Sequence, residues 1–428
     1  MPSRLSRRRF VQGVAAATVA APTILTSLPK ARAAANERLT LGVIGVGTMG
    51  RGHHLKRFLD YGDVQIVAVC DVVAERRDHS QAMVDQRYAD DAKAGTYQGC
   101  QAFNDFRELL ALDGLDAVLI ATPDHWHVPG AILAARAGKD IYCEKPLTLT
   151  IGEGRHLVDE VRANNIIFQT GSQQRSEFGG HFRKAVELVR NGRIGKVKTI
   201  RIGVGGPPVP CDLPEEDVPE GTDWDMWLGQ APWRGYNEIL CPKGVHKHFP
   251  AFRNYREYAG GALADMGAHH FDIAQWALDM DGSGPVKVEP PSGEATSGLK
   301  FTYANGVEMF HGGPTDCTFE GELGTINVSR GHLESSPAEI AKTPLKEGDW
   351  HAPPSDNHGR NWLEAIKTRK LPICDVEVGH RSATVCHLAN LGYQLRRPLV
   401  WDPQKERFEN DDEANVLLNR EPRDPWKI

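Results

Sequence analysis

The feature that most constrains the fold is a glycine-rich hexapeptide near the start of the chain, Gly45-Val46-Gly47-Thr48-Met49-Gly50. It directly follows an apolar run, 39–44, and opens a segment with helical periodicity, 49–59. A Gly-x-Gly-x-x-Gly turn in this position lets the backbone approach a pyrophosphate closely and lets the helix pack tightly on the strand. Glycine turns between strands and helices are common, so the hexapeptide carries weight only through its context. That context predicts a dinucleotide-binding turn at residues 45–50.

Between residues 39 and 170, short β-branched runs alternate with longer helical patterns. Such alternation is typical of crossover units that build a parallel sheet. The expected strands are 39–44, 65–70, 117–121, 140–143 and 166–170, and the expected helices are 49–59, 73–88, 105–112, 128–137 and 152–163. We therefore predict an α/β Rossmann domain with a doubly wound parallel sheet over residues 36–170.

Beyond residue 171 the alternation stops, and a different domain is expected. A long Pro, Gly and Trp-rich stretch, 205–259, interrupts the pattern. The expected helices are 178–191, 264–278, 358–368 and 379–395, and the strand-like runs are 197–204, 298–303, 307–311, 317–320 and 325–328. This pattern predicts a C-terminal α+β domain, residues 171–428, with a large and mainly antiparallel sheet.

The first 35 residues read as a targeting peptide in three parts. Ser6-Arg7-Arg8-Arg9-Phe10-Val11 resembles the twin-arginine export signature, a weakly apolar stretch follows at 14–28, and Ala31-Arg32-Ala33 offers a cleavage site. A disordered basic tail is the alternative. We predict a twin-arginine signal peptide over residues 1–35 and a periplasmic or other extracytoplasmic location. The apolar stretch is short and interrupted by Pro22, so no stable membrane span is expected.

Composition narrows the class of partner. The formal net charge of -6 leaves no basic surplus, so no nucleic-acid partner is expected. The histidine pairs at 125/127, 246/248 and 269/270 lack the ligand spacing of a known metal site, so no metal is expected. The eight cysteines show no disulfide-like spacing and are expected to be mostly buried thiols, although pairing stays open for Cys211, Cys241 and Cys317.

The residue that ends the second expected strand, Asp71, bears on the choice of dinucleotide. A carboxylate there can accept hydrogen bonds from the ribose hydroxyls and would repel a ribose phosphate. This favours NAD over NADP, although Arg76 and Arg77 lie close enough to keep NADP as the less favoured alternative. An aspartate after a strand can also serve only as a helix N-cap.

Two polar segments follow the fourth and fifth expected strands, Thr122-Pro123-Asp124 and Glu144-Lys145-Pro146. In an open parallel sheet the ligand crevice lies at the carboxyl ends of the strands, so both segments are expected to face the cofactor cleft. Farther along, Asp265, His269 and Asp272 share one face of an expected helix through their i, i+4, i+7 spacing. We therefore expect the polar groups of that face to contact polar groups of a ligand or of another part of the protein.

With these motifs in family order, the chain resembles the Gfo/Idh/MocA family, named after glucose-fructose oxidoreductase and inositol dehydrogenase. The resemblance covers nearly the whole chain after residue 35 and implies a homodimer or homotetramer. It implies Lys145, His269 and Asp265 as catalytic residues. It also implies a cofactor site made by Gly45, Gly47, Thr48, Met49, Gly50, Asp71, Thr122, Pro123, His127, Glu144 and Lys145.

The residue types themselves are also suited to the oxidation of an alcohol. Oxidising a secondary alcohol needs a base for the hydroxyl proton, and His269 is suited to that exchange near neutral pH. Lys145 can hydrogen-bond the substrate oxygen, and Asp265 can orient the substrate or the imidazole. The rival interpretations are a solvated loop lysine and a hydrogen-bonded core histidine. The Lys145-Pro146 bond is a candidate cis peptide.

The substrate is expected to be a small carbohydrate or polyol. Trp224, Trp227, Trp233 and Tyr236 can stack on sugar rings, or they can be ordinary packing residues. The expected substrate-binding residues are Lys145, Arg175, His248, Tyr255, Asp265 and His269. Three classes of function stay open: an oxidoreductase on a sugar, polyol or glycoside with tightly kept NAD, a hydrolase or lyase that uses NAD transiently, and a non-catalytic binding protein.

Overall fold

The computed structural model describes residues 38–313 and 316–427, so the signal peptide predicted at residues 1–35 lies outside the described residues. Six parallel strands form a first sheet in the order β3-β2-β1-β4-β5-β6. They are β1 (Leu39–Ile44), β2 (Val64–Cys70), β3 (Gln101–Phe103), β4 (Ala117–Ile120), β5 (Asp140–Cys143) and β6 (Phe168–Thr170). The direction of winding reverses between β1 and β4, and a crevice for ligands forms at such a switch point.

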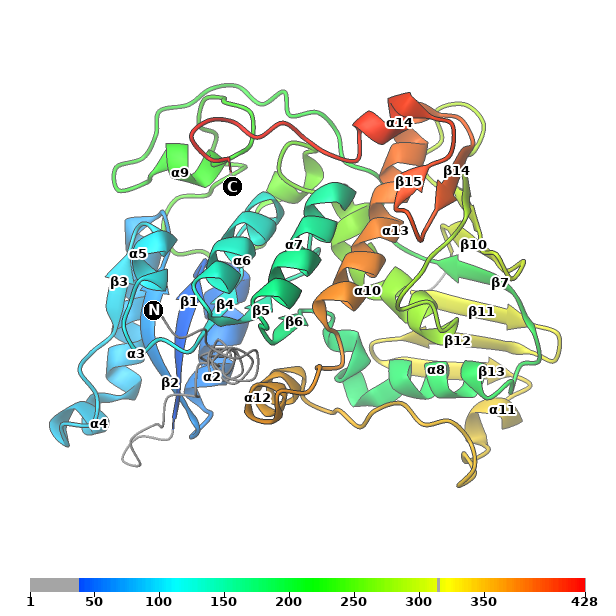
Figure 1. The fold of residues 1–428 in the computed structure, drawn as a ribbon, viewed down its shortest axis with the longest axis horizontal. Helices are drawn as coiled ribbons and strands as arrows, with labels where there is room; N and C mark the ends of the chain where they lie inside the picture. The colour runs from blue at the N-terminus through cyan, green and yellow to red at the C-terminus, as the bar shows by residue number, and fades with distance from the viewer. Residues whose placement is uncertain (1–37, 314–315, 428) are drawn as a thin grey trace, which may run out of the picture. The chain divides into compact units, whose positions relative to one another are not determined.

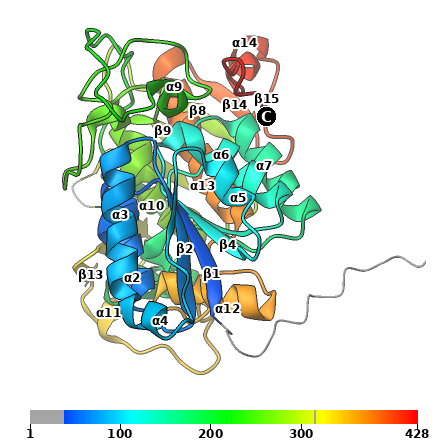
Figure 2. The ribbon, with the colours of Figure 1, turned by 90° about the vertical axis from the view of Figure 1, so that its left-hand side faces the viewer.

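Successive residues of the central strands face opposite sides of this sheet, so each face has its own apolar core. Val118 and Ile120 of β4 belong to a cluster with α5, α6 and α7, whereas Leu119 belongs to one with α2, α3 and α12. Figure 2 shows α3 and α6 on opposite sides of β1 and β2. The covering helices are α2 (Lys56–Leu59), α3 (Ala74–Arg87), α5 (Phe106–Leu110), α6 (His127–Arg136), α7 (Ile151–Ala163) and α12 (His358–Thr368); the short α4 (Ala89–Lys93) follows α3.

A second sheet of nine strands follows, in the order β13-β12-β11-β7-β10-β9-β8-β14-β15. Its pairs are antiparallel except for β7 with β10. The strands are β7 (Val197–Ile202), β8 (Lys287–Glu289), β9 (Lys300–Thr302), β10 (Glu308–His311), β11 (Cys317–Gly321), β12 (Thr325–Ser329), β13 (His332–Ser336), β14 (Leu399–Asp402) and β15 (Arg407–Phe408). A Rossmann domain with a mainly antiparallel C-terminal domain is therefore confirmed as the fold class.

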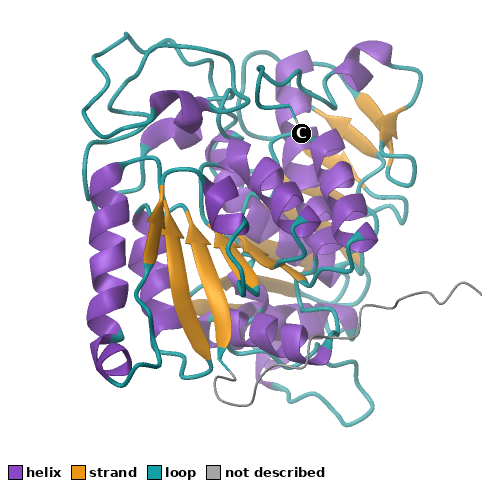
Figure 3. Cartoon of the chain, turned by 60° about the vertical axis from the view of Figure 1, so that its left-hand side comes forward, coloured by secondary structure: helices purple, strands orange, loops and turns teal. Residues whose placement is uncertain are grey.

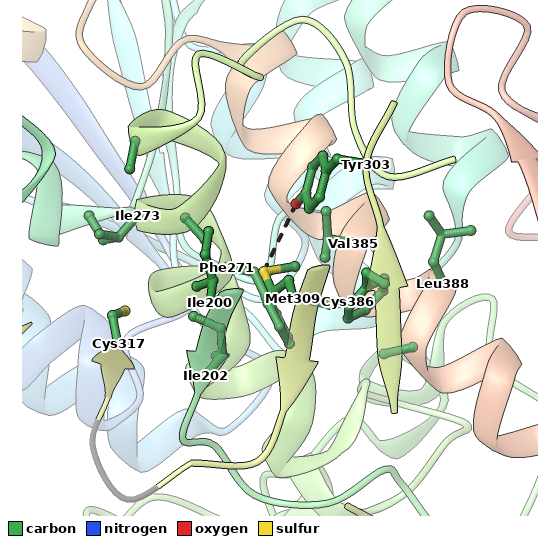
Figure 4. Close-up of a cluster of buried hydrophobic side chains, with 14 of the residues drawn as sticks. Ile200, Ile202, Phe271, Ile273, Tyr303, Met309, Cys317, Val385, Cys386 and Leu388 are labelled. Atoms are coloured by element: carbon green, nitrogen blue, oxygen red, sulfur yellow. Dashed lines mark hydrogen bonds between the residues drawn. The ribbon is translucent and has the colours of Figure 1, made fainter. Parts of the chain in front are cut away.

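Helices α8 (His181–Arg190), α10 (Gly261–Ala277) and α13 (Val376–Leu395) cover one face of the second sheet (Figure 1). The core between them includes Ile200 and Met309 from the sheet and Phe271 and Val385 from the helices, all fully buried (Figure 4). The Tyr303 hydroxyl reaches the Met309 sulfur at 3.9 Å. Since α10 packs on this rigid layer, its polar face is held in a fixed orientation.

The stretch 205–259 is mostly irregular and contains the short helices α9 (Trp224–Leu228) and η5 (Ala251–Asn254) (Figure 3). Its own aromatic cluster holds it together: Trp224 stacks on Trp227 with ring centroids 4.7 Å apart, and Tyr236 is fully buried. Trp224, Trp227 and Tyr236, expected to be either sugar platforms or packing residues, pack against one another, whereas Trp233 is 63% exposed. The carbonyl of Trp227 accepts a hydrogen bond from Trp126 Nε1 (3.0 Å), which ties this stretch to the loop after β4.

Several element boundaries differ from those predicted. The helix expected at 49–59 begins as a wide helical turn, η1 (Gly50–Leu55), before α2. The helix expected at 178–191 starts only at His181, because Gly179 and Gly180 have φ of 65° and 71°. The helices and strands not expected from the pattern include α4, α9, β3, β8, β13, β14, β15, α11 (Glu339–Lys342) and α14 (Asp412–Val416).

Neither a membrane-spanning helix nor a disulfide is found among the described residues. Within the described ranges, none of the helices combines the length and the apolar character needed to cross a bilayer. All eight cysteines are free thiols, and seven of them are buried, with Cys211 partly exposed. Cys211, Cys241 and Cys317 are therefore unpaired in this structure.

Candidate active site

The glycine-rich turn lies where β1 meets η1, and each of its glycines meets a different constraint. Gly45 has φ of 83°, and a Cβ there would come within 2.7 Å of the Ala121 backbone. A Cβ at Gly50 would overlap the carbonyl oxygen of Gly45. A Cβ at Gly47 would meet nothing within 4 Å, because this residue faces an open cavity. The turn thus presents bare backbone to the space where a pyrophosphate is expected.

That cavity encloses about 820 Å³, a volume that includes open solvent at its mouth. Of the predicted cofactor residues, those lining it are Gly45, Gly47, Thr48, Met49, Asp71, Thr122 and Pro123. It extends past Asn104 and Trp227 to Arg253. Gly50, His127, Glu144 and Lys145 do not line it, so the structure gives them other surroundings.

Asp71 is oriented by the backbone rather than by a helix end. Its Oδ2 accepts from the amide of Val46 (3.0 Å) and its Oδ1 from the amide of Val73 (3.0 Å). The neighbouring arginines are both engaged: Arg76 Nε donates to Gly244 O (3.0 Å), and Arg77 Nη1 donates to Asp71 O (2.9 Å). A carboxylate at the cavity wall and arginines held by carbonyls are the arrangement expected for NAD.

His127 and Glu144 lie behind the cavity wall and hold its loops. The His127 ring is buried, with Nδ1 2.7 Å from Pro146 O and Nε2 3.0 Å from Thr122 O. The Oε1 of Glu144 lies 2.7 Å from His54 Nε2 and accepts from Gln173 Nε2 at 2.8 Å. Burial alone would raise the pKa of Glu144, but the contact with His54 and the nearby charge of Lys145 bring it below its usual value. These two residues position the segments that carry Thr122 and Lys145.

Lys145, at the end of the first sheet, forms an ion pair with Asp265 on α10, a helix that covers the second sheet. Lys145 follows β5, its bond to Pro146 is cis as predicted, and its Nζ donates to Asp265 Oδ1 (2.7 Å) and Asp265 O (2.9 Å). Arg253 approaches the same carboxylate, with Nε 3.7 Å from Oδ1. Burial would raise the pKa of Asp265, but these two cations lower it below the ordinary value, so the carboxylate is charged at neutral pH.

His269 lies one helical turn after Asp265 on α10 and is buried. Among the described residues its Nδ1 has no hydrogen-bond partner. Burial, followed by the charges of Lys145 and Arg330, lowers the pKa of His269 well below its usual value. The imidazole is therefore neutral near pH 7 and able to accept a proton.

The other residues on the polar face of α10 belong to the core. Asp272 is fully buried and accepts from Arg175 at Nε and Nη2, both at 2.8 Å; Arg175 also donates to Asp281 at 2.6 Å. The structure therefore does not bring Arg175 to the reaction centre, because carboxylates occupy its donors. The side chain of His248 is exposed, and Tyr255 packs against the Trp224 cluster. Neither lines the cavity, whereas Arg253, between them, does.

Three residues near Lys145 and His269 were missing from the predicted site. Asp124 is 5% exposed, and burial raises its pKa to about 7, with Asp265 adding to the shift while Arg253 and Lys145 oppose it. Arg253 lies in the irregular stretch 205–259, which has no periodic pattern. Arg330, in the turn between β12 and β13, donates from Nε to Gln174 Oε1 (3.2 Å), and no sequence signal marks it. Asp124 had a signal, since it belongs to the polar segment after the fourth strand.

Comparison with known proteins places this geometry in a family. Residues 39–172 match the Gfo/Idh/MocA model described as "Oxidoreductase family, NAD-binding Rossmann fold", and residues 210–428 match the one described as "Oxidoreductase family, C-terminal alpha/beta domain". The myo-inositol 2-dehydrogenase of Thermotoga maritima is 27% identical over 263 residues, 60% of this chain and 61% of that protein. A glycosyl hydrolase family 109 protein of Shewanella pealeana is 30% identical over 216 residues, 45% of this chain and 44% of that protein.

The chain thus matches less than two thirds of the length of these curated relatives. The crystal structure of an aldose-aldose oxidoreductase from Caulobacter crescentus, complexed with glycerol, has a TM-score of 0.57 at 17% identity. It covers 85% of this chain and 99% of that chain, which shows the shared fold. With an NAD-binding Rossmann fold and the C-terminal domain both matched, this protein belongs to the Gfo/Idh/MocA family of oxidoreductases.

Proposed function

We propose that this protein oxidises a secondary hydroxyl of a sugar, polyol or glycoside with NAD held in the cavity beside the glycine-rich turn. The observation that carries the proposal is the Lys145–Asp265 ion pair next to a buried, neutral His269, beside the end of the cavity that Arg253 lines. The fit to the cofactor rests on the open face of Gly47 and on Asp71 at the cavity wall. NAD, when bound there, supplies the acceptor for a hydride.

The residues of the chain supply the proton chemistry and the orientation. His269 accepts the hydroxyl proton, since its imidazole is neutral and its Nδ1 has no partner among the described residues. Lys145 stabilises negative charge on the substrate oxygen, and Asp265 fixes the ammonium through a 2.7 Å contact. His269 is buried, and the Lys145 and Asp265 side chains are only 14% and 28% exposed, so partial exclusion of water strengthens these electrostatic effects.

A second function is favoured by one comparison, the likeness to a glycosyl hydrolase family 109 protein. In that alternative NAD in the same cavity would accept a hydride from a sugar carbon and later return it. Between these two steps the glycosidic group leaves by elimination, with the same residues managing the protons. The sugar unit then leaves the site with no net oxidation. The protein binds NAD and uses Lys145 and His269 under both hypotheses, so only the products distinguish them.

The test is to incubate purified protein with panels of polyols, free sugars and aryl glycosides, and to measure ketone formation and aglycone release together. Ketone formation coupled to NAD reduction supports the oxidoreductase. Aglycone release with no net NADH supports the alternative and contradicts net oxidation. The matched control is Lys145→Ala, which is expected to abolish either reaction.

We also propose export by the twin-arginine route, supported by the motif at residues 6–11, the apolar stretch 14–28 and the cleavage site at residues 31–33. This route carries folded proteins, so the cofactor can be loaded before export. An exported enzyme has no pool of free NAD to exchange with, and its cofactor must be retained and regenerated in place.

A further inference from the structure

A segment of the irregular stretch, residues 241–250, crosses the glycine-rich turn, and we call it the clasp. Thr48 Oγ1 donates a hydrogen bond to the carbonyl of His248 (2.7 Å), and Arg51 Nη2 donates to the carbonyl of His246 (2.6 Å). On the other side, Arg76 of α3 donates from Nε to Gly244 O (3.0 Å) and from Nη2 to Pro242 O. The clasp is therefore tied to both elements that enclose the expected pyrophosphate.

Two arginines and two histidines lie where the clasp meets the turn. Arg51 and Arg76 come from the Rossmann domain, and His246 and His248 come from the clasp, with their ring centroids 4.4 Å apart. Burial, followed by the charges of Arg76 and His248, lowers the pKa of His246 to about 4. Burial and Arg76 also lower the pKa of Arg51, while Asp71 opposes the shift. Mutual repulsion of this kind is relieved by a bound anion.

The nearby Asp71 offsets only part of the positive charge of Arg51 and Arg76. Both oxygens of Asp71 accept from backbone amides, and Glu75, which approaches Gly244, is largely exposed to solvent. Negative charge in the cavity is therefore the missing partner. A pyrophosphate carries two such charges and accepts several charge-assisted hydrogen bonds.

His246 is the clasp residue whose side chain faces the expected pyrophosphate. It lines the same cavity as Gly47 and Thr48. Its Nδ1 lies 3.3 Å from Thr48 Oγ1 and 2.9 Å from the carbonyl of His248. Its Nε2 is buried and lacks a partner within the described part of the chain. A buried polar atom without a partner is costly unless a ligand satisfies it.

We propose that the clasp closes the cavity over the pyrophosphate of the bound dinucleotide, with His246 as an added ligand, so that the cofactor is not exchanged between turnovers. The glycine-rich turn contributes backbone amides from below. From above, His246 takes up a proton from solvent when the anion binds, so that Nδ1 keeps its bond to the carbonyl of His248 and Nε2 donates to the pyrophosphate. The inference rests on the proposed function only in taking NAD as the ligand.

The test measures cofactor exchange without any substrate. The purified protein is loaded with radiolabelled NAD, chased with a large excess of unlabelled NAD, and assayed for retained label over time. We expect slow exchange in the parent protein and exchange at least about tenfold faster in His246→Ala, the loss of one hydrogen bond to a charged group. Lys247→Ala is the matched control, because Lys247 is exposed and does not line the cavity.

Equal retention by the parent and His246→Ala would overturn the proposal, as would exchange within seconds in the parent or equal loss in both variants. A second measurement needs no variant. Lys243 and Lys247 are exposed trypsin sites within the clasp, and saturating NAD is expected to slow cleavage at both; unchanged cleavage contradicts closure. Neither readout involves turnover, so a protein that retains NAD but oxidises nothing would refute the proposed function and leave the clasp standing.

Discussion

His269 and His270 are adjacent on α10, equally buried, and yet have different neighbours. His270 lies over the ring of Phe182 (6.4 Å between centroids), and its Nε2 is 3.7 Å from Asp316. Burial lowers the pKa of His270 to about 4. The charges of Lys145 and Arg330 lower the pKa of both rings, and for His270 the nearby Asp316 opposes them. On α10, the His269 imidazole therefore lies toward the reaction centre and the His270 imidazole lies toward the second sheet.

This difference predicts unequal effects of the same substitution. His269→Gln removes the proton acceptor and is expected to lower kcat by about 100-fold or more, the usual contribution of general base catalysis. His270→Gln is expected to leave kcat within a few-fold of the parent. Steady-state kinetics on the best substrate, with circular dichroism as a check on folding, measure both. Equal losses in the two variants would mean that His269 acts only through packing.

Asp124 introduces a pH dependence of stability. Its pKa is raised to about 7 in the folded protein by burial, whereas an aspartate in the unfolded chain titrates near about 3.9. Between these values the folded state binds the extra proton, so the Asp124 contribution to the free energy of unfolding falls as pH rises from about 4 to about 7. Above that window the full penalty is present.

Asp124→Asn cannot ionise and lacks this penalty. The stability of the variant relative to the parent is expected to rise between pH 5 and pH 8 and to change little above pH 8. Urea unfolding of the cofactor-free proteins at several pH values measures the difference. A stability difference that stays constant across this range would show that Asp124 titrates normally.

The extent to which the site was predictable differs from residue to residue. Lys145, Asp265 and the glycines each belong to a short run of neighbouring residues that can be recognised in the sequence. The structure brings Lys145 and Asp265 within 2.7 Å of each other. Arg253 and Arg330 reach the centre from an irregular stretch and a hairpin turn, and neither has a periodic pattern. His127 and Glu144 belong to motifs, but their side chains bond to the loops behind the cavity instead of lining it.

At the scale of elements, the buried Arg175 joins η3 (Gln173–Arg175) to α10. Its guanidinium pairs with Asp272 and Asp281 and stacks on Trp276, 4.9 Å from the ring centroid. Removing one partner of a buried ion pair leaves an uncompensated charge, which is far costlier than losing an exposed pair. This cluster fixes the helix that carries Asp265 and His269.

Arg175→Met is therefore expected to lower the free energy of unfolding by about 3 to 5 kcal/mol. Asp281→Asn is the matched control, because the Asp281 side chain is 33% exposed and the Asp272 contact remains; a loss of about 1 kcal/mol or less is expected. Urea denaturation followed by tryptophan fluorescence measures both. A small loss in Arg175→Met would show that the cluster does not hold α10.

Elements with a strong period were predictable, and short ones were not. β1, β4 and β5 are apolar runs next to turn residues, and β1 keeps its predicted bounds. β14 and β15 have four and two residues, too few to show alternation. β14 pairs with β8 across more than a hundred residues of sequence, and β15 pairs with β14. Docking of α12 on the first sheet was also unpredictable, since an amphipathic face does not identify its partner.

At the scale of the whole molecule, the export proposal makes a separate prediction. Replacing both Arg7 and Arg8 with lysine keeps the charge and removes the twin-arginine pair. Since the route reads that pair, the variant is expected to stay in the cytoplasm with its first 35 residues attached. Cell fractionation and mass spectrometry of the N-terminus measure this, and normal export of the variant would contradict the prediction.

The central claim is that Lys145 and His269 promote hydride transfer from a substrate hydroxyl to NAD that stays bound. It is tested most directly by mixing NAD-loaded protein with a substrate found in the panel, in a single turnover, and following absorbance at 340 nm. We predict reduction of the bound cofactor in the parent protein, slower with substrate deuterated at the reacting carbon, and no reduction in Lys145→Ala. An isotope-independent signal, or the same signal in Lys145→Ala, would contradict the claim.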